Sequence, residues 1–286
     1  SRVRTKPETE LAPGHACMRA PRHALFARVP KTCNLMTHSE PKNFIYSKIG
    51  VKVYLKPEYH PSLRATDLSH PDILRKAREL FDKRHGRVAG LPKICSENSE
   101  DAQTWSHFSP LLSMSSEKRG NGLETFLEES LKRKPKQDLV KMLPEAKLMF
   151  WRGKRAKPMY KPPPNLGCRE GNTEVDLTIL AEKAIIFVEA KYHSKIVTHT
   201  THCPNRDQII RNIDVGTYYA WNKGLDFYFV LLTSSNRNKS AKLLRHYLDN
   251  PQEIVDRLSH RTDISKKIEQ IANKLGLTTW DQLRKI

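Results

Sequence analysis

The sequence predicts an α/β fold in which a mixed central sheet is flanked by helices. Two apolar runs, 175–180 and 184–188, are separated by a connection of hairpin-loop length and therefore predict two antiparallel strands. A helical stripe over 206–221 then leads into the continuous apolar run 226–232, which predicts a strand buried on both faces. Because a helix that connects neighbouring strands implies a parallel crossover, the sheet should combine both kinds of pairing.

The elements ahead of this hairpin complete a core. Residues 122–134 predict a helix, and residues 147–151 form a short apolar run that predicts the first strand of the sheet. The apolar face of the helix consists of Leu123, Phe126, Leu127 and Leu131. The expected order of elements is therefore helix, three antiparallel strands, helix and strand.

A smaller group of elements precedes this core. Residues 44–55 predict a strand pair that turns around Gly50. Residues 71–85 predict a helix, because Pro71 stands in its first turn and Gly86 follows its end. We expect these elements to form an accessory α+β subdomain.

Composition and pattern divide the chain into four parts. Residues 1–35 are rich in Arg and Pro and lack periodicity, which predicts a basic, disordered leader; a transit-like or a non-native leader is the alternative. The accessory subdomain spans 36–95, the α/β core spans 96–240, and C-terminal helices are expected over 241–286. The corresponding helical patterns lie at 240–248, 251–258, 264–275 and 278–286.

Two acids and a lysine lie together on the hairpin strands. Asp176 follows the start of the first strand, and the tripeptide Glu189-Ala190-Lys191 ends the second. Because side chains alternate along a strand, Glu189 and Lys191 should project from one face and Ala190 from the other. Two carboxylates in a half-buried site repel each other, and a hard cation such as Mg²⁺ removes that conflict. A lysine beside such a cation can orient or deprotonate water, or stabilise charge on a phosphate, so the pattern predicts phosphodiester hydrolysis.

These residues and the order of elements resemble the PD-(D/E)XK nuclease superfamily, whose restriction-endonuclease-like core runs αβββαβ. Asp176 matches the first strand acid of that family, Glu189 the second and Lys191 its lysine. Val175 stands where the family usually has proline. The resemblance covers about the last two thirds of the chain and implies that residues 96–240 are a nuclease core.

The chain more closely resembles uncharacterised prokaryotic members of this superfamily. These carry a phrase like Glu-Ala-Lys-Tyr-x-Ser followed by Asp-Gln-x-x-Arg-Asn, and the two phrases stand here at 189–194 and 207–212. The resemblance implies that Gln208 reaches back toward the lysine or the scissile phosphate. A solvated polar residue at the start of the helix is the alternative reading of Gln208.

The family usually adds an acid from its leading helix, and two positions offer one. Ser99 would cap a helix with Glu100 in its first turn, in a phrase similar to one found ahead of the core in the prokaryotic members. Glu124 is the other candidate. Local helix electrostatics also explain both acids, Glu100 through the helix dipole and Glu124 through a charged stripe. We favour Glu100.

The resemblance therefore implies a nuclease that depends on Mg²⁺ or Mn²⁺ and acts as an endonuclease on DNA. Asp176, Glu189 and the carbonyl of Ala190 would hold the metal. Lys191 would position or activate water, and Glu100 would complete the site.

The composition agrees with a polyanionic partner. Fifty Lys and Arg against 31 Asp and Glu give a net charge of +19, which is typical of proteins that bind nucleic acid. A basic segment after the first strand of the sheet also contains Trp151 and Tyr160, which suits a phosphate track with stacking. A solubilising, proline-rich insertion is the alternative. The basic residues of this segment are Arg152, Lys154, Arg155, Lys157 and Lys161.

Two other classes of function compete with the nuclease. One is a nucleic-acid-binding module that keeps the nuclease fold and performs no chemistry. The other is a zinc-binding interaction domain built around His199, His202 and Cys203, with His193 and Cys168 as further ligands. Structural zinc usually takes paired ligands from two loops, and the sequence offers one such pair, which makes incidental His and Cys in a loop the simpler interpretation.

Cysteine spacing and hydropathy bear on location and assembly. The five cysteines are widely spaced, so we expect no disulfide framework and a protein of the reducing cytoplasm. No apolar run approaches the ~20 residues of a membrane-spanning helix. A homodimer is the alternative to a monomer, because many enzymes that cut both strands of DNA pair two active sites.

Overall fold

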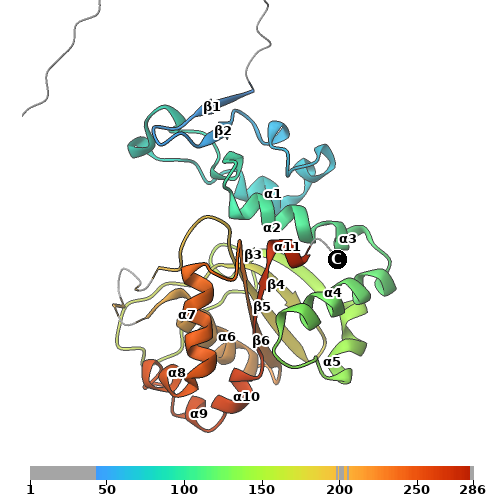
Figure 1. Cartoon of the computed structure of the whole chain (residues 1–286), viewed down its shortest axis with the longest axis vertical. Helices are drawn as coiled ribbons and strands as arrows, with labels where there is room; N and C mark the ends of the chain where they lie inside the picture. Colours follow the sequence, from blue (N-terminus) through green and yellow to red (C-terminus); the bar gives the residue numbers. More distant parts are fainter. Residues whose placement is uncertain (1–42, 198, 200–202, 205, 284–286) are drawn as a thin grey trace, which may run out of the picture. The chain divides into compact units, whose positions relative to one another are not determined.

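The computed structural model describes residues 43–197, 199, 203–204 and 206–283 (Figure 1). These residues belong to one compact unit. The expected leader over 1–35 lies outside the described residues. The boundaries at 95 and 240 between an accessory part, a core and a C-terminal part stay predictions.

A five-stranded mixed sheet forms the centre of the unit, with its strands in the order β3-β4-β5-β6-β7. The first three strands pair antiparallel, whereas β6 pairs with β5 in parallel and β7 pairs with β6 in parallel. The predicted hairpin and the parallel crossover are therefore both confirmed. The strands are β3 Lys147–Arg152, β4 Val175–Leu180, β5 Ala184–Lys191, β6 Asp226–Thr233 and β7 Leu275–Thr279.

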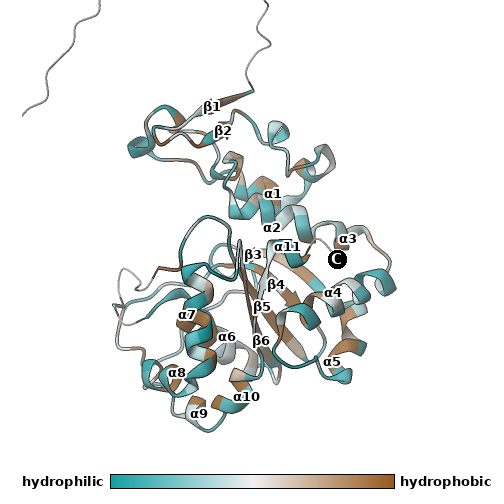
Figure 2. Cartoon of the chain, viewed as in Figure 1, coloured by the Kyte–Doolittle hydropathy of each residue, from teal (hydrophilic) through white to brown (hydrophobic). Residues whose placement is uncertain are grey.

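Helices cover both faces of the sheet (Figure 1). One face packs against α2 Glu100–Phe108, α3 Pro110–Ser113, α4 Ser116–Ser130, α5 Gln137–Met142 and α11 Trp280–Leu283. The other face packs against α6 Gln208–Trp221, α7 Lys239–Asp249, α8 Pro251–Arg257, α9 Thr262–Ser265 and α10 Ile268–Ala272. Figure 2 shows hydrophobic strands between helices whose outer faces are hydrophilic, as expected for a sheet buried on both sides.

The central strand β5 is buried at all eight of its positions. Its even-numbered residues, such as Ile186 and Val188, belong to the core on the α2–α5 face, whereas Ile185 and Phe187 belong to the core on the α6 face. Asp207 caps the start of helix α6: its Oδ1 accepts hydrogen bonds from the backbone N–H groups of Ile209 and Ile210, at 2.8 and 3.0 Å. Its apolar stripe packs on the sheet, as its helical period predicts.

The segment ahead of α2 contains the predicted strand pair, β1 Phe44–Tyr46 and β2 Lys52–Tyr54. The helix predicted over 71–85 is wrong in its second half, because α1 spans only Pro71–Lys76. After α1 the backbone pairs with a later segment: Lys93 donates to the Glu79 carbonyl at 2.7 Å, and Leu80 bridges to Pro92. Short 3-10 turns cover Pro57–Tyr59, Ala65–Ser69, Lys83–Val88, Lys93–Cys95 and Leu143–Glu145.

The C-terminal part corrects a second prediction. The helical pattern over 264–275 is split into α9 and α10, and the next residues form strand β7 beside β6, so 241–286 is not purely helical. Glycine and threonine are weak helix formers, and β6 offers an edge that needs a partner. At Gly276 a Cβ would lie 2.8 Å from the Ser130 carbonyl, so this close approach of α4 to β7 requires glycine.

None of the helices in the described ranges is long and apolar enough to cross a membrane.

Candidate active site

The site begins where β4 and β5 separate. The register of these strands runs from Leu180 opposite Ile185 to Leu177 opposite Val188. One residue beyond the last pair, Asp176 Oδ2 accepts a hydrogen bond of 2.8 Å from the backbone N–H of Ala190. The carboxylate therefore binds a backbone group that the diverging strand no longer pairs, and this fixes it beside the end of β5.

Glu189 and Lys191 project from the same face of β5, as predicted. Lys191 Nζ lies 2.8 Å from Glu189 Oε1, and the two residues are 6% and 4% exposed. Ala190 between them is buried in the core on the opposite face. A buried ammonium and a buried carboxylate at hydrogen-bond distance form a strong ion pair, because water does not screen them.

Glu100 is the helix acid that the structure brings to this pair. Ser99 caps α2 by accepting from the backbone N–H of Ala102 at 3.1 Å, which places Glu100 in the first turn. Glu100 Oε2 lies 3.5 Å from Lys191 Nζ. Its Oε1 accepts from the backbone N–H of Tyr192 at 3.1 Å and from the hydroxyl of Ser194. Helix α2 is thereby joined to the chain that leaves β5.

The alternative acid, Glu124, takes no part in these contacts. It lies half-buried on α4. Among the described residues no hydrogen bond or ion pair joins Glu124 to Lys191 or Glu189.

Asn212 is a site residue that the sequence interpretation missed. Its Nδ2 donates to Glu189 Oε2 at 3.1 Å, so both oxygens of that carboxylate have partners. The Asn212 Oδ1 atom is buried and has no hydrogen-bond partner among the described residues. Gln208, predicted to reach the site, instead accepts from the Val197 backbone N–H at 3.2 Å. Residues four apart share one helix face, so the position one turn after Gln208 was a detectable signal.

A second buried lysine lies beside the site. Lys76 Nζ, from α1, lies 2.7 Å from Glu174, 3.2 Å from Glu79 and 3.5 Å from Asp101. Burial and the neighbouring carboxylates Glu174, Glu79 and Glu100 raise the pKa of Asp101 to about 6, against the opposite effect of Lys76. No motif marks this cluster, because its members come from three distant parts of the chain.

Charge crowding changes the titration of the central groups. Burial, and then the charge of Glu189, raise the pKa of Asp176 well above its ordinary value. Burial alone would lower the pKa of Lys191, but the carboxylates of Glu189, Asp176 and Glu100 outweigh it and hold that pKa above its usual range. Lys191 is therefore protonated at neutral pH.

The donor set suits a hard divalent cation in its chemistry. Asp176, Glu189 and Glu100 supply carboxylate oxygens, and their mutual repulsion is the condition that a cation relieves. In the described part of the chain, no group of three His, Cys, Asp or Glu side chains is arranged to hold a metal ion. The Lys191 ammonium lies against both Glu189 and Glu100, so a metal there would compete with it for oxygens.

The predicted basic segment is exposed in part, but its aromatic residues are not. Lys154, Arg155 and Lys157 are exposed, with Arg155 Nη1 3.5 Å from Glu79, whereas Arg152 is bound to Asp72 at 3.0 Å. Stacking of bases on the aromatic residues of this segment is excluded in this conformation. Trp151 and Tyr160 are both 0% exposed, and the Tyr160 hydroxyl donates to Thr178 Oγ1 at 3.0 Å.

The expectation of unpaired cysteines is wrong. Cys168 and Cys203 form a disulfide, and Cys95 is buried as a free thiol. The inference of a cytoplasmic location loses the support it drew from unpaired cysteines. The zinc interpretation also loses Cys203 as a thiolate ligand, while His202 lies outside the described residues.

We expect Asn212→Leu to destabilise the protein by about 1–3 kcal/mol, because it leaves a buried carboxylate oxygen of Glu189 without its donor. Urea unfolding of the variant measures this loss. Asn222→Leu, at the exposed C-terminal end of the same helix, is the matched control and should stay within about 0.5 kcal/mol of the wild type. Equal stabilities of the two variants would contradict the bond between Asn212 and Glu189.

In comparisons with protein-family models, with curated proteins and with solved structures, nothing matches this chain.

Proposed function

We propose that this chain is a nuclease that depends on Mg²⁺, or on Mn²⁺ in its place, and hydrolyses phosphodiester bonds of DNA. The observation that carries the proposal is the convergence of three carboxylates, Asp176, Glu189 and Glu100, around one buried lysine at the end of two neighbouring strands. Carboxylates crowded into a partly buried site are costly to stability, and such arrangements are concentrated at functional sites.

The roles of the side chains follow from their charges. Asp176, Glu189 and the Ala190 carbonyl would hold a Mg²⁺ ion, which would supply Lewis acidity toward the scissile phosphate. Lys191, protonated because of its acidic neighbours, would stabilise negative charge on the phosphate and orient water. This protonation argues against Lys191 as the base. Glu100 would hold Lys191 and the chain after β5 in place through its contacts with Tyr192 and Ser194.

The fold supports the same proposal. We infer that α2, β3, β4, β5, α6 and β6 form a restriction-endonuclease-like core, because their order and pairing agree with the αβββαβ pattern. The net charge of +19 supports a polyanionic substrate. Exposed Lys154, Arg155 and Lys157 would contact the phosphate backbone beyond the site.

Cleavage of supercoiled plasmid in Mg²⁺ tests the proposal. We expect the wild type to nick or cut the plasmid and EDTA to stop the reaction. Lys191→Met keeps the buried alkyl stem and removes the ammonium, so the cleavage rate should fall at least ~10²-fold. Lys195→Met, an exposed lysine nearby, is the matched control and should cleave at the wild-type rate. Equal cleavage by the wild type and Lys191→Met would reject the proposed role.

A nucleic-acid-binding module without chemistry is the second candidate. The observation in its favour is that the Lys191 ammonium already neutralises Glu189, so the buried pair is stable without a metal. A gel-shift assay in EDTA, run beside the cleavage assay, separates the two functions. DNA binding without cleavage in either Mg²⁺ or Mn²⁺ would favour the module, whereas cleavage lost in Lys191→Met favours the nuclease.

A further inference from the structure

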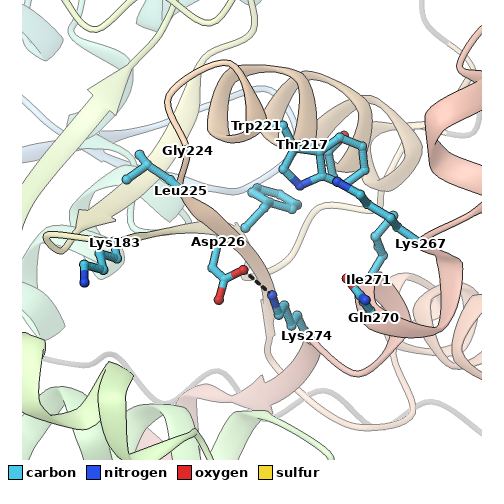
Figure 3. Close-up of a pocket in the computed structure, with 11 residues that line it drawn as sticks. Lys183, Thr217, Trp221, Gly224, Leu225, Asp226, Lys267, Gln270, Ile271 and Lys274 are labelled. Carbon is cyan, nitrogen blue, oxygen red and sulfur yellow. Dashed lines mark hydrogen bonds and ion pairs between the residues drawn. The ribbon is translucent and has the colours of Figure 1, made fainter.

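A separate hollow of about 420 Å³ lies at the opposite end of β5 from the candidate active site (Figure 3). Lys183, in the turn before β5, lines one side. The C-terminal end of α6 with Trp221, the start of β6, and α10 with the residues on either side of it line the rest. The eight residues of β5 span about 23 Å, so this hollow is distinct from the site around Lys191.

The charge of the hollow is positive. Its lining residues include Lys183, Lys267 and Lys274 against one acid, Asp226, whose carboxylate lies 2.6 Å from Lys274 Nζ (Figure 3). Asp263 lies near Lys267, but Arg261 already binds both of its oxygens at 2.7 and 2.8 Å. Two ammonium groups therefore remain in excess over the carboxylates, which suits an anionic ligand.

An aromatic and apolar surface lies beside these ammonium groups. Lys267 Nζ lies 4.2 Å from the centroid of the half-buried Trp221 ring. Phe227 and Ile271, 3% and 4% exposed, also line the hollow. Phe227 packs so tightly on α6 that a Cβ at Gly216 would lie 2.0 Å from its ring, so this glycine is required for the packing. An apolar wall beside cationic groups suits a planar ring that carries a phosphate.

We propose that this hollow binds a nucleoside phosphate, with the phosphate on Lys183 and Lys267 and the base against Trp221. Its volume lies within the range of small-molecule sites. The ligand could be a free mononucleotide or one nucleotide of a strand, since both present the same base and phosphate. The inference does not rest on the proposed nuclease activity, because none of the residues of this hollow belongs to the candidate active site.

Calorimetric titration with adenosine 5′-monophosphate in EDTA tests the proposal. We expect the wild type to bind it, and adenosine, which lacks the phosphate, to bind at least about tenfold more weakly. Lys267→Gln should weaken binding of the nucleotide at least about tenfold. Lys266→Gln removes the same charge from the neighbouring exposed residue outside the hollow and should bind like the wild type. Thermal unfolding of both variants verifies that they are folded.

A second titration distinguishes the two sources of the ligand. A strand segment is the ligand if a single-stranded oligonucleotide binds and the mononucleotide binds too weakly to detect. Lys267→Gln should then weaken binding of the oligonucleotide, and Lys266→Gln should not. The reverse result supports a free mononucleotide. If neither probe binds, or if both lysine variants weaken binding equally, the hollow is not a nucleotide site. These outcomes are independent of cleavage, so failure here leaves the nuclease proposal to its own test.

Discussion

Replacing Asp176 with Asn is expected to abolish cleavage and, in EDTA, to make the protein more stable. The two effects have one cause. The wild-type carboxyl group is partly buried beside the charge of Glu189, and both raise its pKa, which means that its ionised form is unfavourable in the fold. The Asn oxygen can still accept the hydrogen bond from Ala190 that now holds Asp176 at 2.8 Å. The substitution removes the charge and keeps the geometry.

The gain in stability should depend on pH in one direction. The folded pKa of Asp176 lies above its ordinary value of 3.8, so the folded state binds more protons in the interval between the two values. Wild-type stability then falls as the pH rises through this interval and stays lowered above it. Asp176→Asn lacks this loss, and its advantage over the wild type should grow from about pH 4 upward.

Thermal unfolding in EDTA and plasmid cleavage in Mg²⁺ measure the two halves of this prediction. We expect the variant to unfold at a higher temperature than the wild type at pH 8 and to cleave at least ~10³-fold more slowly. Asp138→Asn, an exposed acid on α5, is the control that should change neither property much. A variant that is inactive because it is less stable would contradict the explanation, and so would one that still cleaves.

The largest loss of stability is expected for Asp214→Asn. Asp214, 0% exposed on α6, binds Arg206 at 2.6 Å, Arg261 at 2.9 Å and His260 at 2.9 Å. Both arginines are buried as well. Removing one partner from a buried ion-pair network leaves uncompensated charge and costs about 3–5 kcal/mol.

Urea or thermal unfolding under non-reducing conditions measures this cost, which should lower the midpoint temperature by about 10 °C. Asp263→Asn is the matched control, because Asp263 binds the same Arg261 but is half-exposed. A pair at the surface contributes about 0–1 kcal/mol, so this variant should stay close to the wild type. Similar losses in the two variants would contradict the claim that the buried ion pairs of Asp214 stabilise the fold more than a pair at the surface does.

Local sequence patterns were sufficient to predict most of the sheet and the centre of the site. The hairpin, α6 and β6 follow from alternation and helical period, and alternation along β5 places Glu189 and Lys191 on one face. The cap at Ser99 correctly placed Glu100 at a helix start. In each case the decisive interactions lie within a few residues or between adjacent strands.

The missed features all depend on contacts between distant parts of the chain. Strand β7 forms because it pairs with the edge of β6. Its own short sequence does not stand out from the helical pattern around it, so it was predicted as helix. Lys76 reaches Glu174 across 98 positions, and the Cys168–Cys203 disulfide joins two loops. Trp151 and Tyr160 lie among basic residues in the sequence, but the core takes their rings. Neighbours in sequence do not reveal such burial.

Diffraction from crystals soaked in Mn²⁺ tests the central claim most directly, because anomalous scattering locates the ion itself. We expect one peak within about 2.1 Å of carboxylate oxygens from both Asp176 and Glu189, with the Lys191 ammonium displaced from Glu189. A peak elsewhere, or no peak while Lys191 Nζ stays 2.8 Å from Glu189 Oε1, would contradict the claim that these acids share a metal ion.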